Sequence, residues 1–176
     1  MGERLGWTSF KEVFSRMAKT VLGVFNSVDQ AEKAADELQR KGFSRNEISI
    51  IAKESSTRRG GDRDKETMNQ DLSQGVSTGG AIGGAAGLLA GIGALAIPGI
   101  GPIVAAGPIA AALTGAVTGG VAGGLLDWGV PEETGRKYEE KVKEGKIVAA
   151  VKTNDDKVQD AADILRRNGA SGVETH

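Results

Sequence analysis

The chain has 176 residues, a formal net charge of −1 and no cysteine. The near-neutral charge gives no reason to expect nucleic acid as a partner, and without cysteine there are no disulfides and no thiolate metal sites. The single histidine is the terminal residue, His176, where disorder is common, so a histidine-based catalytic or metal site is not expected. We therefore expect a non-enzymatic protein with no cofactor, no metal and no small-molecule substrate.

Residues 1–19 predict a short amphipathic helix. Three aromatic side chains, Trp7, Phe10 and Phe14, follow helical spacing, and the polar face carries lysine and arginine. Three interpretations remain: a helix docked on an open face of the fold, an interfacial membrane anchor, and a flexible tail. The segment lacks the continuous apolar run of a cleavable signal peptide, so we expect a cytoplasmic protein.

Residues 20–52 alternate between strand and helix patterns. Strands are predicted over residues 20–27 and 47–52, because both runs are rich in large apolar residues. Between them, residues 29–41 have the periodic apolar positions of an amphipathic helix, and Gly42 is a suitable stop. This order is a βαβ unit.

Residues 53–72 form a polar connection of mixed charge, which is either a mobile linker or the solvated start of a helix. Arg58 and Arg59 could contact anionic lipid. The acidic residues that follow them dilute this positive field, so lipid recognition here is the less favoured interpretation.

Residues 73–126 are the most unusual part of the chain, because the run from Leu72 to Leu126 contains no charged residue and more than half of the 27 glycines. Small residues recur at every fourth position in two arms, and residues four apart share one face of a helix. The Gly/Pro turn from Pro98 to Pro102 separates the arms. The pattern predicts a glycine-zipper helical hairpin that allows close backbone approach. We call this row of small residues the stripe, and we expect it to serve helix packing and self-association. Its glycines are Gly75, Gly79, Gly83, Gly87, Gly91, Gly107, Gly115, Gly119 and Gly123.

These arms are expected at about residues 74–96 and 108–126, and they should not be stable alone in water. Each glycine costs about 1 kcal/mol relative to alanine in a helix interior. The stripe therefore needs a partner, which is the other arm, a second copy of the protein or lipid. Each arm could cross a hydrocarbon layer of about 30 Å. Two interpretations stay open: a hairpin that enters the membrane and returns, and a buried hairpin inside a soluble oligomer.

Residues 127–145 predict a connecting helix that begins after Pro131 and runs to about Lys143, with Gly145 closing it. Its carboxylates and basic side chains are interpreted as a solvated face. Trp128 precedes this helix and fits two positions equally well, the interface belt of a membrane arm and a cover over the sheet. Together with the three aromatic residues of the N-terminal segment, it is a candidate interface anchor.

An internal repeat indicates the architecture. Residues 146–176 contain a second strand–helix–strand pattern, and the sequence A-A-D-x-L-x-R-x-G occurs in both units, at 34–42 and at 161–169. Two βαβ units in series predict an α+β fold with a ferredoxin-like split βαβ sheet built from residues 20–52 and 146–176. The long glycine-zipper hairpin is then an insertion in that sheet.

We expect the two flanking units to fold together without the insertion, because the cost of closing a loop grows only slowly with its length. Their two helices cover one face of the sheet. The other face needs cover from the N-terminal helix, from the helix after Pro131, or from a second subunit.

Two sequence runs carry a family resemblance. Residues 20–38, T-V-L-G-V-F-N-S-V-D-Q-A-E-K-A-A-D-E-L, resemble bacterial general stress proteins of the heat-induced stress-protein type. The glycine-zipper hairpin followed by G-V-P-E-E-T-G-R-K-Y-E-E-K-V-K-E-G-K-I-V-A-A-V, residues 129–151, is similar to the related low-temperature-induced and general-stress proteins. The resemblance covers about residues 20–175. It implies a stress-associated, non-enzymatic protein and transfers no catalytic residue.

Two functional hypotheses follow. The first is a homo-oligomeric stress protein that contacts membrane or lipid through its hairpin, as a peripheral or re-entrant protein at the inner face of the cell membrane. The second is a soluble homo-oligomeric assembly or scaffold protein, in which hairpins from several copies pack against each other without a membrane.

Overall fold

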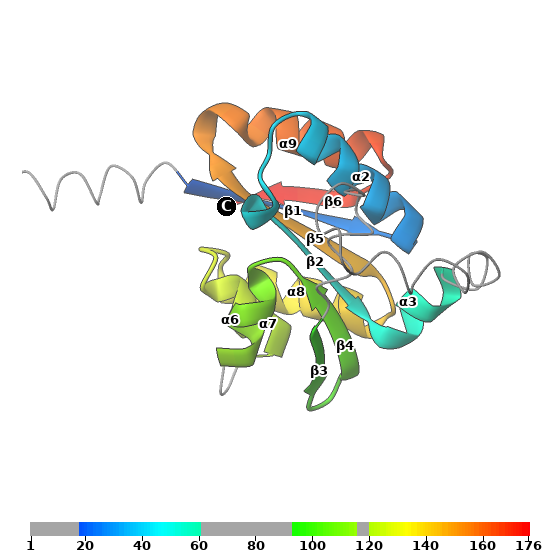
Figure 1. Cartoon of the computed structure of the whole chain (residues 1–176). Helices are drawn as coiled ribbons and strands as arrows, with labels where there is room; N and C mark the ends of the chain where they lie inside the picture. Colours follow the sequence, from blue (N-terminus) through cyan, green and yellow to red (C-terminus); the bar gives the residue numbers. More distant parts are fainter. Residues whose placement is uncertain (1–17, 61–92, 116–119) are drawn as a thin grey trace, which may run out of the picture.

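The computed structural model describes residues 18–60, 93–115 and 120–176 (Figure 1). The expected N-terminal helix, with its candidate anchors Trp7, Phe10 and Phe14, lies outside the described residues up to position 17. Most of the first glycine-rich arm lies outside them as well. The stripe positions outside the description are Gly75, Gly79, Gly83, Gly87, Gly91 and Gly119.

The described chain is an α+β fold built on one antiparallel sheet with strand order β3-β4-β2-β5-β1-β6. The strands are β1 (Ala18–Phe25), β2 (Ile48–Lys53), β3 (Gly93–Ile97), β4 (Gly101–Ala106), β5 (Ile147–Asn154) and β6 (Ser171–Thr175). The helices are α2 (Val28–Arg40), η1 (Arg45–Glu47), α3 (Glu54–Gly60), α6 (Ile109–Gly115), α7 (Gly120–Leu126), α8 (Glu132–Lys143), η4 (Asp155–Lys157) and α9 (Val158–Arg167).

The strands of the two flanking units interleave at the centre of the sheet. β1 pairs with β5 in unbroken register from Ala18 opposite Asn154 to Phe25 opposite Ile147, and β5 pairs with β2 on its other side. These strands are apolar over consecutive positions because both faces of the sheet are covered. Buried residues therefore form two clusters, one on each side of the sheet.

Helices α2 and α9 cover the first face (Figure 1). Their periodic apolar residues, including Leu38 and Leu165, are buried against the sheet. The hydroxyl of Ser27 accepts a hydrogen bond from the backbone N–H of Gln30 at 3.4 Å and caps the start of α2. At the far ends of the helices, the carboxylate of Glu37 accepts a hydrogen bond from Arg167 at 2.6 Å. The repeated sequence thus forms a matched pair of helices on one face.

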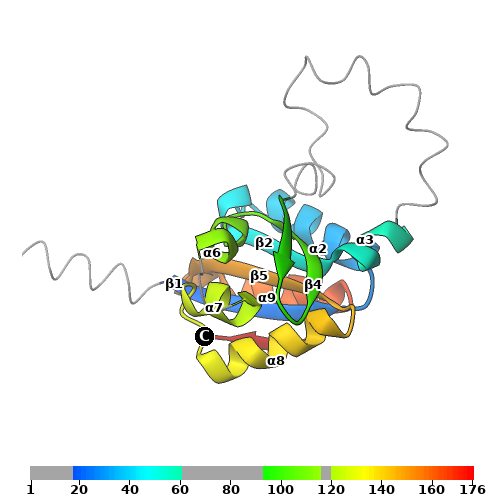
Figure 2. The same ribbon diagram turned by 90° about the horizontal axis from the view of Figure 1, so that it is seen from below.

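Helices α6, α7 and α8 cover the opposite face, which Figure 2 shows from below. The helix after Pro131, α8, is one of the three covers that we expected, and it runs from Glu132 to Lys143 as predicted. The rest of the cover comes from the second glycine-rich arm. Its buried apolar side chains include Ile109, Leu113, Val121 and Leu125. Half of the expected insertion is therefore part of the hydrophobic core.

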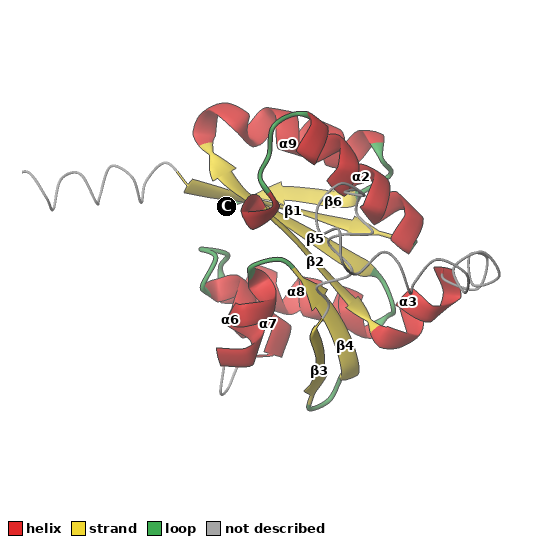
Figure 3. Cartoon of the chain, in the orientation of Figure 1, coloured by secondary structure: helices red, strands yellow, loops and turns green. Residues whose placement is uncertain are grey.

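The described part of the insertion is not the expected helical hairpin (Figure 3). Residues 93–96, expected at the end of the first helical arm, belong to strand β3, and the segment after the turn is strand β4. The turn itself is present, since Gly99 has a φ of 85° and the N–H of Ile100 donates to the carbonyl of Ile97 at 3.1 Å. Each glycine weakens a helix by about 1 kcal/mol relative to alanine, and the β-branched residues Ile97, Ile103 and Val104 suit a strand. Pairing of β4 with β2, and of β3 with β4, therefore outweighs the helix propensity of the alanines.

Glu47 gives the fold a defined dependence on pH. Burial alone would raise the pKa of its carboxyl, but hydrogen bonds from Ser44 and Thr153, together with the charge of Lys157, lower the pKa below its ordinary value of 4.5. The backbone N–H of Ser44 donates to Glu47 Oε2 at 2.7 Å, and the Thr153 hydroxyl donates to Oε1 at 2.9 Å. The ionised carboxylate therefore joins the loop before β2 to strand β5.

We expect Glu47→Gln to reduce the loss of stability on acidification. Because the pKa of Glu47 is lower in the folded state, its contribution to the free energy of unfolding is complete above its ordinary pKa. This contribution is lost as the pH falls through the lower pKa of the folded state. The measurement is urea unfolding of both proteins at about pH 7 and about pH 3. Thr153→Val, which removes one of the donors, should show a smaller reduction. An unchanged difference between the two pH values in Glu47→Gln would contradict this assignment.

Candidate interaction surface

The segment after β4 approaches the sheet closely at Gly107. This residue has a φ of 85°, and a Cβ atom placed there would collide with the carbonyl oxygen of Ile48 and lie 2.9 Å from Ser49 Oγ. The buried Ser49 hydroxyl accepts a hydrogen bond from the N–H of Ile109 at 3.2 Å and so satisfies the start of α6. Gly107 therefore lets the chain turn from β4 into α6 against β2.

The predicted stripe does not continue along one helix in the second arm. Gly107 precedes α6, Gly115 is the last residue of α6, and Gly123 lies in the separate helix α7. A fourth-residue spacing places side chains on one face only while the helix is continuous. The expectation of one zipper face through these three glycines is therefore wrong, although close packing of small residues does occur nearby.

Two glycines that we did not single out provide the close helix contacts. A Cβ atom at Gly124 of α7 would lie 2.7 Å from Leu113 Cδ2 of α6. A Cβ atom at Gly135 of α8 would lie 3.1 Å from the carbonyl oxygen of Ala122 in α7. The signal for Gly135 in the sequence was an isolated glycine inside a charged helical pattern, where glycine costs about 1 kcal/mol relative to alanine. The three helices thus form a closely packed layer on the sheet.

We expect Gly135→Ala to destabilise the protein by about 1–3 kcal/mol, despite a gain of about 1 kcal/mol in helix propensity. The new methyl group would press on the backbone of Ala122, which cannot move without shifting α7. The matched change Gly124→Ala meets the Leu113 side chain, at 2.7 Å from Cδ2 and 3.2 Å from Cγ. These atoms can move without a shift of a helix backbone, so its loss of stability should be smaller. Urea unfolding of both variants checks this difference. A loss at Gly124 equal to that at Gly135 would contradict it.

Trp128 takes the second of the two positions left open for it, a cover over the sheet. Its side chain is buried with the residues of α6, α7 and α8. Its carbonyl accepts a hydrogen bond from the hydroxyl of Thr20 in β1 at 2.6 Å, and Lys152 Nζ lies 5.9 Å from the centre of its ring. In this position it is not available as an anchor at a membrane interface.

The carboxylates of α8 are mostly paired with neighbours on the helix surface. Arg136 Nη2 lies 2.6 Å from Glu132, and Lys143 lies 2.8 Å from Glu140, in exposed pairs. Glu139 differs, because its Oε2 accepts a hydrogen bond from the backbone N–H of Ala122 at 3.0 Å, near the start of α7. The solvated-face interpretation therefore holds for this helix, with one carboxylate tied to the helix layer.

Tyr138 ties the helix layer to the last strand. Its hydroxyl donates a hydrogen bond to the carbonyl of Gly172 in β6 at 2.6 Å. Burial, with an added contribution from the negative charge of Glu174, raises the pKa of the hydroxyl, so it remains a neutral donor at physiological pH. This contact fixes α8 near one edge of the sheet.

An apolar crevice lies on the first face, between α2, α3 and the strands β2 and β4. Its cavity volume is about 10 Å³. That is about the space that one water needs, so the crevice is too narrow for a small molecule. Its lining residues are Val28, Ala31, Glu32, Ile50, Ala52, Thr57, Val104, Ala106 and Ile147.

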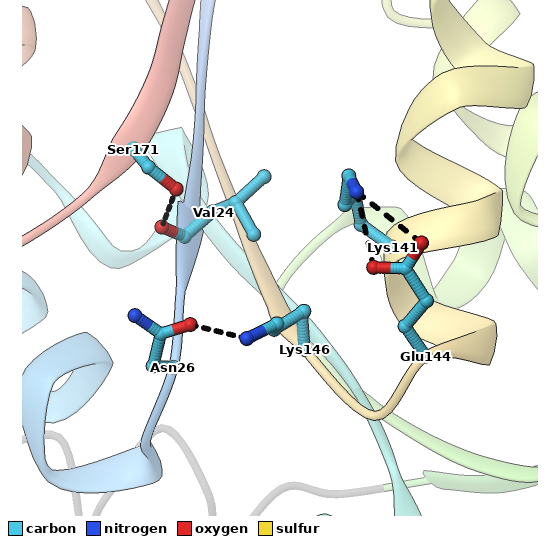
Figure 4. A network of polar contacts seen from close by, with 6 residues as sticks. All are labelled: Val24, Asn26, Lys141, Glu144, Lys146 and Ser171. Atoms are coloured by element: carbon cyan, nitrogen blue, oxygen red, sulfur yellow. Dashed lines mark hydrogen bonds and ion pairs between the residues drawn. The ribbon is translucent and has the colours of Figure 1, made fainter.

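The two edges of the sheet differ in how they are protected. At the β6 edge the pairing with β1 shifts register between Leu22 and Val24, and the hydroxyl of Ser171 donates to the carbonyl of Val24 at 3.3 Å (Figure 4). β6 also carries a charged residue, Glu174. Lys146 donates to Asn26 Oδ1 at the same end of the sheet (Figure 4). A register shift and a charge are devices that discourage strand addition.

The opposite edge, β3, has none of these devices. Its five residues pair with β4 without a register shift, from Gly93 opposite Ala105 to Ile97 opposite Gly101. None of the five is charged, and no strand within the described ranges pairs with its outer side. We call this outer side the β3 edge, and it is the candidate interaction surface.

In the described ranges, none of the helices combines the length and the apolar character needed to cross a membrane. Over the same residues, no group of three or more His, Cys, Asp or Glu side chains is placed to hold a metal ion.

Comparisons with protein-family models, with curated proteins and with solved structures find no match. The family resemblance therefore stays an expectation.

Proposed function

We propose that the protein is a non-enzymatic, stress-associated protein that acts by binding other copies of itself. The observation that carries this proposal is the β3 edge, which is uncharged, regular and without a neighbouring strand among the described residues. A strand of this kind presents unpaired N–H and C=O groups to any chain that can align with it. Self-association in the cytoplasm, as an assembly or scaffold protein, is the function that uses this surface.

We further infer a ferredoxin-like split βαβ arrangement for the two flanking units. The order β2-β5-β1-β6, the helices α2 and α9 on one face, and the repeated A-A-D-x-L-x-R-x-G sequence support it. In this proposal β3, β4, α6 and α7 belong to the insertion. The insertion then serves two purposes, since it covers the second face and presents a new edge.

The glycine repeat from Gly75 to Gly91 is proposed as a second contact between copies. Its support is the fourth-residue spacing in the sequence. The glycines of the second arm are used differently, because Gly107 and Gly124 pack within the chain itself. The proposal of a helical packing stripe is thus confined to the first arm.

Lipid contact is a second candidate function, and it is favoured by one observation. Residues 72–92 are an uncharged, glycine-rich run in the sequence. By contrast, the apolar side chains of the second arm, such as Ile109 and Leu125, are buried against the sheet. A two-armed re-entrant hairpin would require α6 and α7 to leave the core, so lipid contact is proposed for residues 72–92 alone.

Light scattering of the purified protein over a wide concentration range tests self-association. We expect the mass to rise above that of one chain, and a single-chain mass at every concentration would overturn the proposal. Gly83→Leu should reduce the mass, because a bulky side chain separates helices that meet at the stripe. The matched change Leu89→Ala should reduce it less. Cell fractionation with and without carbonate separates the two functions, since an assembly protein is recovered in the soluble fraction without detergent.

A further inference from the structure

The hydrogen-bonding groups of the β3 edge can be assigned from Pro102. This residue lies opposite Ala96 in the pairing of β3 with β4. Because proline has no N–H, the two residues cannot exchange hydrogen bonds, and antiparallel pairs alternate along a ladder. Leu95 and Ile97 therefore bond to β4, while the N–H and C=O groups of Ala94 and Ala96 point away from it. These four groups are the ones that a new strand would meet.

We propose that the β3 edge pairs with the β3 edge of a second copy, antiparallel and about a two-fold axis at Leu95. This inference rests on the proposed function and names its interface. Only residues with outward groups can exchange hydrogen bonds, so Ala94 of one copy pairs with Ala96 of the other, and the reverse. The pairing makes four hydrogen bonds, uses all five residues of β3, and joins two six-stranded sheets into one.

A second copy of the same chain suits this edge because β3 carries no charge. Two-fold pairing places β3 of one copy beside β3 of the other. Any charged residue near the axis would therefore lie opposite the same charge, which is destabilising. β3 has no charge, and its only large side chains, Leu95 and Ile97, lie on the face that α6 and α7 cover. The β6 edge, with Glu174 and its register shift, does not offer this match.

Cysteine cross-linking tests the register, because the natural chain has no cysteine. In the proposed pairing the two copies of Leu95 face each other with a Cα–Cα distance of about 4.5 Å, which a disulfide can span. The two copies of Ile97 lie four residues apart along the ladder, more than about 13 Å, which it cannot span. Under diamide, Leu95→Cys should form covalent dimers at least about tenfold faster than Ile97→Cys.

A proline substitution provides the second test. Ala96→Pro removes one outward N–H but no bond to β4, and proline is tolerated on edge strands in this position. We expect the dimer to be lost while the melting temperature of the monomer stays the same. Ala96→Val keeps the N–H and should keep the dimer.

Several results would overturn the inference. They are a Leu95→Cys protein that stays monomeric, equal cross-linking of the two cysteine variants, and a dimer that survives Ala96→Pro. If the natural chain still associates in any of these cases, the β3 pairing fails and the proposed self-association stands. A natural chain that is monomeric at every concentration overturns both.

Discussion

A chain in which a Gly/Ser linker replaces residues 55–130 is expected to lose cooperative unfolding. The sequence alone favours the opposite result, because the two flanking units contain four strands and two helices of one sheet. The structure places β4, α6 and α7 in the core, so the replacement exposes the second face of β1, β2 and β5. The removed side chains that are buried on this face include Ile103, Ile109, Val121, Leu125 and Trp128.

The apolar burial that this chain loses is comparable in magnitude to the whole stability of the domain. Full burial of one large apolar side chain contributes about 1.5–3 kcal/mol, and the net stability of a domain is about 5–15 kcal/mol. Removal of five such side chains, together with their partners on the sheet, is comparable to the whole. Helix α8 would remain, but it loses Ala122, against which its Gly135 packs.

The control is a chain in which a flexible linker replaces only residues 61–92. This chain keeps every residue of the two buried clusters, so we expect cooperative unfolding to persist. Circular dichroism with thermal and urea unfolding distinguishes the two chains. Cooperative unfolding of the larger deletion would show that the helix layer is dispensable, and failure of the smaller one would show that residues 61–92 contribute to the core.

Gly107→Ala is expected to be the most damaging single substitution, with a loss of about 4 kcal/mol or more. A left-handed backbone conformation costs an alanine about 1–2 kcal/mol. The larger part comes from contact with the Ile48 carbonyl and with Ser49, which belong to the rigid strand β2. Relief of this contact would move α6 away and break the hydrogen bond from Ile109 N–H to the Ser49 hydroxyl, leaving a buried group without a partner.

Gly99→Ala is the matched control for this substitution. Gly99 has the same φ of 85°, but a Cβ atom there would meet nothing within 4 Å. Its cost should therefore be only the conformational one, about 1–2 kcal/mol. The measurement is the melting temperature of both variants, in which each kcal/mol corresponds to about 2–4 °C for a chain of this size. If Gly107→Ala does not accumulate in soluble form while Gly99→Ala does, this result also supports a larger loss of stability at Gly107. Equal losses of stability in the two variants would show that the close contact of Gly107 with β2 adds nothing to the cost.

The elements with a strong local pattern could be predicted from the sequence. The helices α2 and α9 were expected from their apolar periodicity, and α8 from Pro131 and its acidic first turn. The glycines expected to end helices, Gly42, Gly145 and Gly169, have positive φ values in the structure. These features depend on neighbours in sequence, so local physical chemistry is sufficient to determine them.

The interaction surface could not be predicted, because it depends on pairing between distant residues. Residues 93–96 were expected at the end of a helical arm, yet they belong to β3, which pairs with β4, and β4 in turn pairs with β2. The glycines of the second arm have a helical spacing, yet Gly107 turns the chain and Gly124 receives Leu113.

The sequence by itself determined the two βαβ units and the uncharged character of the insertion. Only the tertiary structure decided which face that insertion covers and which sheet edge it leaves without a neighbouring strand among the described residues. The physical reason is that pairing between distant segments outweighs local propensity there: β3 and β4 pair as strands although alanine favours helices and glycine favours neither state.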